Sequence, residues 1–130
     1  MNILIVDDSR MMRMKLKGII TSSGLTIGAV HEANHGKEGL EVLSANAVDV
    51  VFTDINMPEM DGRAFLREMR DKGIATQAFK VVCTTEGVDA LKDEFATCGV
   101  NLYVEKPFQP DVVKAALGEV AKRVKLAQSA

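Results

Sequence analysis

Short apolar runs recur along the whole sequence. Each run has three to five residues, is rich in β-branched side chains and is too short for a buried helix. Because nearly every position in a run is apolar, rather than every second one, the pattern favours strands covered on both faces of a sheet. The five predicted strands cover residues 3–6, 27–30, 48–52, 79–83 and 102–104.

Between these runs, apolar residues recur at the spacing of a helix with one buried face. Predicted helices cover residues 10–20, 36–43, 63–70, 88–98 and 110–124, and the last begins at Pro110, which suits a first turn. Alternating strands and helices imply right-handed βαβ crossovers. The sequence therefore predicts an α/β fold, a doubly wound five-stranded parallel sheet with five helices.

Polar residues that can carry chemistry follow four of the five predicted strands. In an open parallel sheet, ligands bind outside the carboxyl ends of the strands, so these residues are expected at one edge. They are Asp7 and Asp8 after the first strand, Asp54 after the third, Thr84 and Thr85 after the fourth, and Lys106 after the fifth.

Three carboxylates in one crevice would repel each other unless a cation neutralises part of their negative charge. Oxygen ligands of this kind suit Mg²⁺, and Lys106 adds a fixed positive charge. A carboxylate beside Mg²⁺, a lysine and a hydroxyl is suited to forming an aspartyl phosphate, with Asp as the nucleophile. Taken singly, each residue is more typical of a turn, a helix cap or a solvated side chain, but all of them at one edge favour a site.

Composition narrows the class of protein further. The 130 residues suit one domain, residues 1–130, with no room for an output domain. Sixteen basic against eighteen acidic residues give a net charge of -2, which disfavours a nucleic-acid binder. The longest charge-free stretch is broken by polar residues and glycines, and the first residues do not form a secretory signal, so we expect a cytoplasmic protein with no membrane contact. Cys83 and Cys98 are expected to be buried free thiols.

At these residues the sequence resembles the receiver domain of two-component response regulators. The matching segments are ILIVDDS, VVFTDINMPEMDG, VVCTT and YVEKPF, which span most of the chain. The resemblance implies a flavodoxin-like sheet with strand order 2-1-3-4-5. It also implies that Asp54 is the phosphoacceptor, that Asp8 binds Mg²⁺ directly and Asp7 through water, and that Asn56 offers its backbone carbonyl. Mn²⁺ can substitute for Mg²⁺ in such a site.

The same resemblance implies how phosphorylation is read. Thr84 would be the switch hydroxyl, Lys106 the phosphate-binding lysine and Tyr103 the aromatic switch residue, and Pro107 would follow a cis peptide bond. Phosphate adds about 1.5 to 2 negative charges. Thr84 would move toward it, Tyr103 would rotate inward, and the surface of the fourth helix, fifth strand and fifth helix would change.

Three further positions are expected to tune loss of the phosphate. In receiver domains the residues two after the acceptor and two after the switch hydroxyl do so; here they are Asn56 and Glu86. We hypothesise that both orient an attacking water. Thr85 stands where the family usually has alanine, and its larger side chain narrows access to Asp54.

The resemblance implies a response regulator that receives phosphate from a histidine kinase or phosphotransfer protein and signals by contact with a downstream protein. It would catalyse its own phosphorylation and dephosphorylation without turning over a separate substrate, as a monomer or weak dimer. Chemotaxis is a natural pathway for a stand-alone receiver. Two alternatives are an Mg²⁺-dependent aspartyl-phosphate phosphohydrolase, disfavoured because such enzymes carry a DxD arrangement after the first strand, and a constitutive binding scaffold.

The first predicted helix carries four basic residues and no acid: Arg10, Arg13, Lys15 and Lys17. This pattern is typical of a docking face for an acidic partner or, equally, of a solvated helix face. Helical phase places Arg13 on the polar face, Met12 in the core and Met14 at the surface. His31 and His35 have no accompanying ligands and are expected to be surface histidines.

Overall fold

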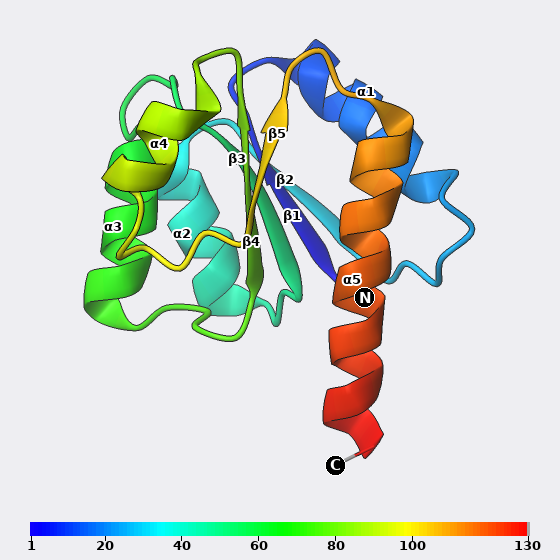
Figure 1. Cartoon of the computed structure of the whole chain (residues 1–130). Coiled ribbons are helices and arrows are strands. Elements are labelled where there is room, and N and C mark those ends of the chain that lie inside the picture. The colour runs from blue at the N-terminus through cyan, green and yellow to red at the C-terminus, as the bar shows by residue number, and fades with distance from the viewer. Residues whose placement is uncertain (130) are drawn as a thin grey trace.

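The computed structural model describes the backbone of residues 1–129 and the side chains of residues 1–125. Strands and helices alternate along the described chain (Figure 1). The strands are β1 (Ile3–Val6), β2 (Val30–Ala33), β3 (Val50–Asp54), β4 (Phe79–Thr84) and β5 (Leu102–Glu105). The helices are α1 (Arg10–Thr21), α2 (Gly36–Ala45), α3 (Gly62–Lys72), α4 (Val88–Glu94) and α5 (Pro110–Ser129).

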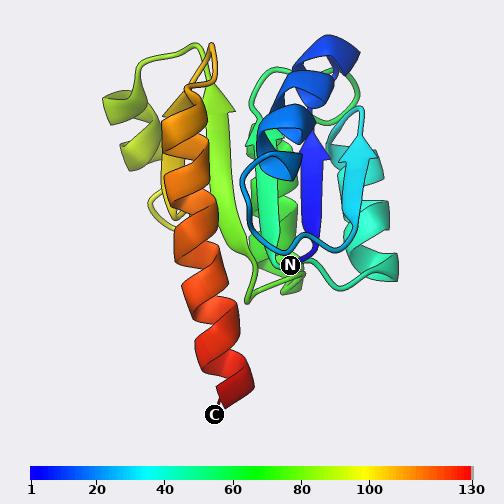
Figure 2. The ribbon, with the colours of Figure 1, turned by 90° about the vertical axis from the view of Figure 1, so that its right-hand side faces the viewer.

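The strands form one parallel sheet in the order β2-β1-β3-β4-β5, which confirms the predicted fold class. Helices α1 and α5 cover one face, in front of the sheet in Figure 2, and α2, α3 and α4 cover the other. The central strand β3 pairs with β1 and β4, and Val6 lies opposite Thr53 in the β1–β3 register. This register brings the carboxyl ends of β1 and β3 to the same level.

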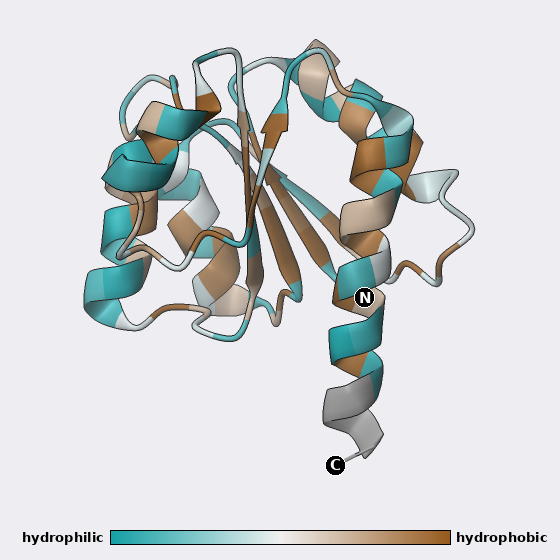
Figure 3. Cartoon of the chain, in the orientation of Figure 1, coloured by the Kyte–Doolittle hydropathy of each residue, from teal (hydrophilic) through white to brown (hydrophobic). Residues whose placement is uncertain are grey.

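Successive residues of each strand feed two separate hydrophobic cores, because strand side chains alternate between the faces. Ile3 and Ile5 pack with Leu16 of α1 and Leu117 of α5 on one face. Leu4, Val6 and Val51 pack with Phe65 and Met69 of α3 on the other. Figure 3 shows the central strands as hydrophobic along their length. Burial on both faces explains why the strands appear as continuous apolar runs.

Three predicted boundaries are wrong. The second strand, predicted at 27–30, is β2 at Val30–Ala33, because Val30 pairs with Ile3 at the start of β1. Ile27 packs against the core from the preceding loop, so its apolar character reflects burial outside a strand. Since β2 is an edge strand, it accepts His31 and Glu32 at positions that a central strand would fill with apolar residues.

The third strand is two residues later than the predicted 48–52, and it ends on Asp54 itself. The fourth helix, predicted at 88–98, ends at Glu94. Phe95 and Cys98 still reach the core, from the turns after the helix. The helical spacing of these two apolar residues therefore reflects their burial and does not show that the helix continues.

The phase of α1 also differs from the prediction. Arg13 is buried, because its Nη1 donates to the Asp7 carbonyl at 2.7 Å and its Nε lies 3.0 Å from Glu32 Oε1. Met12 is half-buried and is not a core residue. Met14 is exposed, as predicted, but so is Met11. Arg13 is therefore buried by its partners, one just after β1 and one on β2, although the hydropathy pattern predicted an exposed side chain.

Cys83 and Cys98 are buried free thiols, as predicted. Burial raises the pKa of the Cys83 thiol, so the reactive thiolate is scarce at neutral pH. Among residues 1–129, no helix combines the length and the hydropathy that a membrane span requires.

Among the glycines, Gly62 at the start of α3 leaves the least room for a side chain. Its N–H donates to the Ile55 carbonyl at 2.7 Å, and a Cβ there would collide with the backbone carbonyl of Asp54. Gly118, inside α5, is the contrasting case, because a Cβ there would meet no atom of the described chain within 4 Å.

We therefore expect Gly62→Ala to lower the free energy of unfolding by about 1–3 kcal/mol, since β3 or α3 must shift. Gly118→Ala should raise it by up to about 1 kcal/mol, because alanine favours a helix over glycine. Urea denaturation of both variants measures the difference. Equal effects of the two substitutions would contradict the close approach at Gly62.

Candidate acidic site at the carboxyl edge of the sheet

Three aspartates meet at the carboxyl ends of β1 and β3. One carboxylate oxygen from each of Asp7, Asp8 and Asp54 lies within 4.8 Å of the others. Asp7 is buried, Asp54 is half-buried and Asp8 is exposed, so the cluster opens to solvent on the Asp8 side. The sequence predicts this grouping, because adjacent parallel strands bring their carboxyl ends to one place.

Hydrogen bonds hold two of these aspartates in place. Asp7 Oδ1 accepts from the Ser9 N–H at 2.9 Å, and Asp54 Oδ1 accepts from the Ile55 N–H at 2.8 Å. By contrast, no described residue donates to the Asp8 carboxylate. Asp8 therefore keeps its oxygens free for a ligand, while Asp7 and Asp54 are oriented by the backbone.

Lys106 supplies the positive charge inside the cluster. Its Nζ lies 2.8 Å from Asp7 Oδ2 and 3.2 Å from Asp54 Oδ2. Burial alone would lower the pKa of Lys106, but the hydrogen bond that its amine donates to Asp7 and the two negative charges outweigh burial, so the pKa is raised. Desolvation raises the pKa of Asp54, and the attraction of Lys106 offsets part of that rise.

The backbone around Lys106 fixes where its amine lies. The Lys106 N–H donates to the Thr84 carbonyl at 2.8 Å, which joins the ends of β4 and β5. The peptide bond between Lys106 and Pro107 is cis. Lys106 thus lies at the same sheet edge as the three aspartates, on the opposite side of β3 from β1.

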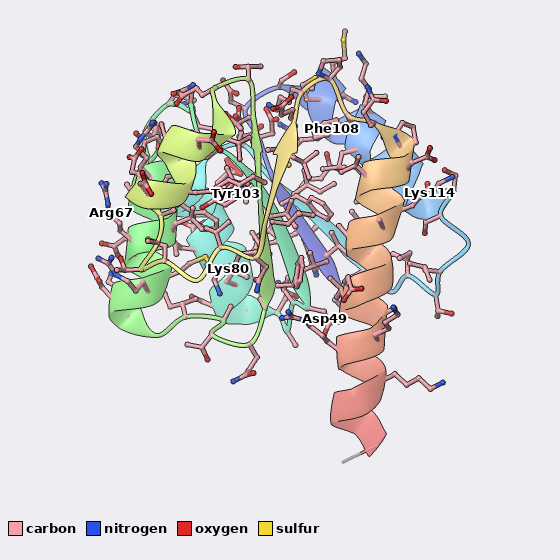
Figure 4. The ribbon with its side chains drawn as sticks, viewed as in Figure 1. Asp49, Arg67, Lys80, Tyr103, Phe108 and Lys114 are labelled. Atoms are coloured by element: carbon pink, nitrogen blue, oxygen red, sulfur yellow. The ribbon has the colours of Figure 1, made fainter. Side chains whose placement is uncertain are left out.

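Thr84 ends β4 at this edge, whereas Tyr103 lies near the start of β5, opposite Val82. The Thr84 side chain is buried, and its Oγ1 accepts from the Glu86 N–H at 2.8 Å. Tyr103, labelled in Figure 4, is half-buried against the core below α4, and its hydroxyl donates to the Leu91 carbonyl at 3.5 Å. Burial raises the pKa of the Tyr103 hydroxyl, which keeps it protonated as a donor.

The residues expected to tune the site also meet. Asn56 Nδ2 donates to Glu86 Oε1 at 3.2 Å, which links the loop after β3 to the loop after β4. Thr85 is exposed beside them. Glu86 has a second partner that sequence reasoning missed: Arg63 Nη2 donates to Glu86 Oε2 at 3.2 Å. Arg63 appears in the sequence as one of several basic residues on α3, and nothing in that pattern distinguishes it.

His35 differs from the predicted surface histidine. Its side chain is 14% exposed, and Nδ1 accepts from the Glu38 N–H at 3.3 Å, which caps the start of α2. Its Nε2 lies 3.5 Å from both Glu38 Oε1 and Glu59 Oε2. His35 therefore ties α2 to the loop after β3. A capping histidine is difficult to predict, because serine, threonine and aspartate are the usual caps.

This arrangement of charges suits a divalent cation together with an anionic group. Three carboxylates within reach of one point provide hard oxygen ligands, and the Lys106 amine is available for the oxygens of an anion. The donor set therefore fits Mg²⁺ better than a soft metal, because neither buried cysteine belongs to the cluster.

A flavodoxin-like sheet with this acidic edge defines a class of α/β proteins that bind charged ligands at the strand ends. A sequence model of the response regulator receiver domain matches residues 3–118. The chain belongs to the response regulator receiver family.

Relatives with known roles are close in length. The chemotaxis protein CheY of Thermotoga maritima is 39% identical over 92% of this chain and 97% of its own. The chemotaxis protein CheY1 of Helicobacter pylori is 42% identical over 90% and 94%. Among solved structures, chemotaxis protein CheY4 of Vibrio cholerae has a TM-score of 0.80 at 28% identity, covering 92% of this chain and 97% of that one. The chain is thus similar to chemotaxis response regulators.

A Lys106→Met variant is expected to lose about 3 kcal/mol of unfolding free energy in EDTA at pH 7, because Asp7 and Asp54 then face each other without a cation. Adding Asp54→Asn should restore part of the loss. Urea denaturation measures both. The control is Lys122→Met, which removes an exposed pair with Glu119 and should cost less than about 0.5 kcal/mol. If the Lys106 and Lys122 variants are equally stable, the amine does not balance the cluster.

Proposed function

We propose that this protein is a phosphoryl-accepting response regulator whose phosphoacceptor is Asp54. The observation that carries this proposal is the position of the Asp54 carboxylate beside a lysine amine and two further aspartates. A nucleophilic carboxylate needs neighbours that neutralise the incoming phosphoryl oxygens, and Lys106 and a cation at the aspartates provide them.

In this proposal Asp8, Asp54 and the Asn56 carbonyl would hold Mg²⁺ directly, and Asp7 would hold it through water. Mn²⁺ can substitute. The bound ion would neutralise charge on the phosphoryl oxygens. Asp7 has a second role, because its Oδ2 orients the Lys106 amine. The Ile55 N–H keeps the Asp54 carboxylate in one orientation while the donor approaches.

The transfer step itself is simple. An oxygen of the Asp54 carboxylate forms a bond to phosphorus while the bond from phosphorus to a histidine nitrogen of the donor breaks. The departing imidazole keeps the electron pair and takes a proton from solvent. The donor would be a histidine kinase or a histidine phosphotransfer protein. Lys106 holds the phosphoryl group afterwards through a charge-assisted hydrogen bond.

The output would be a change of surface. The phosphoryl group adds about 1.5 to 2 negative charges beside Thr84. In the present structure the Thr84 hydroxyl accepts from Glu86, so turning to donate to phosphate would release that loop. Tyr103 would then leave the Leu91 carbonyl and turn inward, and the surface of α4, β5 and α5 would change. A downstream protein that prefers this surface would also favour phosphorylation.

Chemotaxis is the pathway that we propose, because the named relatives reported above are chemotaxis proteins. We further propose that the protein works in the cytoplasm as a monomer or weak dimer, without contact to nucleic acid or membrane. It would act on itself and would turn over no separate substrate.

Incubation with Mg²⁺ and acetyl phosphate tests the acceptor directly. We expect one phosphoryl group per wild-type chain, none in Asp54→Asn, and none in wild type when EDTA removes the metal. Intact-protein mass spectrometry at neutral pH counts the groups. Asp71→Asn, an exposed aspartate on α3, is the control and should be labelled as wild type is.

Three results would contradict the proposal. Labelling that survives in Asp54→Asn would place the acceptor elsewhere. Labelling coupled to continuous turnover of a small phosphate ester would instead favour the phosphohydrolase. A wild-type protein that accepts no phosphate, yet binds its partners, would favour the constitutive scaffold.

Metal binding is tested separately by its effect on the free energy of unfolding. A ligand that binds the folded state alone adds RT ln(1 + [L]/Kd), or about 1.4 kcal/mol when Mg²⁺ is tenfold above its dissociation constant. We expect this gain in wild type and its loss in Asp8→Asn, measured by urea denaturation with and without Mg²⁺. Retention of the full gain in Asp8→Asn would exclude Asp8 as a direct ligand.

A further inference from the structure

Arg63 joins two carboxylates that belong to different parts of the chain. It lies in the first turn of α3, where its Nη2 donates to Glu86 in the loop after β4 and its Nε donates to Glu94 at the end of α4. The side chain is 27% exposed. The hydrogen bond that Arg63 donates to Glu94 is the main cause of a raised pKa of Arg63, so the guanidinium remains charged throughout the physiological range.

Glu86 is held from three directions. Its Oε2 accepts from Arg63 at 3.2 Å, its Oε1 accepts from Asn56 at 3.2 Å, and its backbone N–H donates to Thr84 Oγ1 at 2.8 Å. Asp54 pairs with Cys83 in the β3–β4 register, so the loops after these two strands are neighbours, and the side chains of Asn56 and Glu86 meet between them. The Glu86 carboxylate therefore has a defined position at the mouth of the acidic site.

A free carboxylate would be poorly suited to this place. The site already holds three aspartates, and a phosphoryl group would add more negative charge. Without a partner, Glu86 would be repelled and would turn toward solvent. Arg63 opposes that repulsion because its positive charge lies against Oε2 of Glu86, the oxygen that Asn56 does not contact.

We infer that Arg63 is a positioning residue that holds Glu86 at the mouth of the site and thereby sets the rate at which the aspartyl phosphate is hydrolysed. This inference rests on the proposed function. In the hydrolysis, a water oxygen bonds to phosphorus and the bond from phosphorus to the Asp54 oxygen breaks. Asp54 regains its carboxylate, and inorganic phosphate leaves with both protons of the water. Glu86 and Asn56 orient that water, and Arg63 fixes Glu86.

A purely structural role for Arg63 is the main alternative, because Arg63 also connects α3 to α4 through Glu94. The chain offers a matched control for this connection. Arg67, one turn further along α3 and labelled in Figure 4, lies 3.7 Å from the same Glu94 oxygen, and no contact to Glu86 is found for it in the described part of the chain. Arg67→Met therefore weakens the connection between the helices and leaves Glu86 in place.

The experiment compares phosphate lifetimes. Each variant is phosphorylated with acetyl phosphate and Mg²⁺, the donor is removed by rapid desalting, and loss of the label is followed by mass spectrometry. Arg63→Met is expected to slow hydrolysis about fivefold, because the hydrogen bond that is lost holds Glu86 and does not touch the reacting atoms. Arg63→Lys should recover part of the rate, and Arg67→Met should keep the wild-type rate.

A Glu86→Gln variant tests whether Arg63 affects hydrolysis by positioning Glu86. If Arg63 acts through Glu86, Arg63→Met should cause no further slowing in a Glu86→Gln background. Equal slowing of hydrolysis by Arg63→Met and Arg67→Met would overturn the inference. So would an Arg63→Met substitution that slows hydrolysis as much in the Glu86→Gln background as in wild type. So would an unchanged lifetime in an Arg63→Met protein that is labelled normally, which would leave the proposed function intact. A wild-type protein that accepts no label would overturn both.

Discussion

The balance of charge around Lys106 is the constraint on which the functional part of this structure depends. Two aspartates with little exposure lie within hydrogen-bond reach of one amine, and a third lies beside them. Buried carboxylates are unfavourable without a cation, so the amine stabilises the cluster, but one positive charge does not balance three carboxylates. The remaining negative charge favours binding of a divalent cation. The positive charge of that cation would in turn favour binding of a negatively charged phosphoryl group.

The pairing of the strands brings these charged residues together. Parallel pairing of β1 with β3 brings their last residues side by side, and the contact between β4 and β5 carries Lys106 to the same edge. Around the edge, loops are held by short contacts, including Gly62 against the Asp54 backbone and Arg13 against the Asp7 carbonyl. Rigid surroundings of this kind keep the charged groups close despite their repulsion.

The sequence predicts the parts that follow from periodicity and from position after a strand. Apolar runs predicted the sheet, and the residues after them predicted the cluster of Asp7, Asp8 and Asp54. What it did not predict depends on tertiary partners. Arg13 is buried because Asp7 and Glu32 accept its hydrogen bonds, and β2 begins late because its register is set by β1. Arg63 and His35 likewise have roles that only their neighbours define.

The shortness of α4 has a consequence for motion. Leu91 is its one buried residue, and within the described chain no side chain caps its start at Gly87. Much of its attachment comes from polar contacts of α3, in which Arg63 and Arg67 reach Glu94. An element with so little buried apolar surface opens locally at a small free-energy cost. Its amide hydrogens should therefore exchange with solvent sooner than those of β4, and the molecule has a segment that can rearrange while the sheet stays folded.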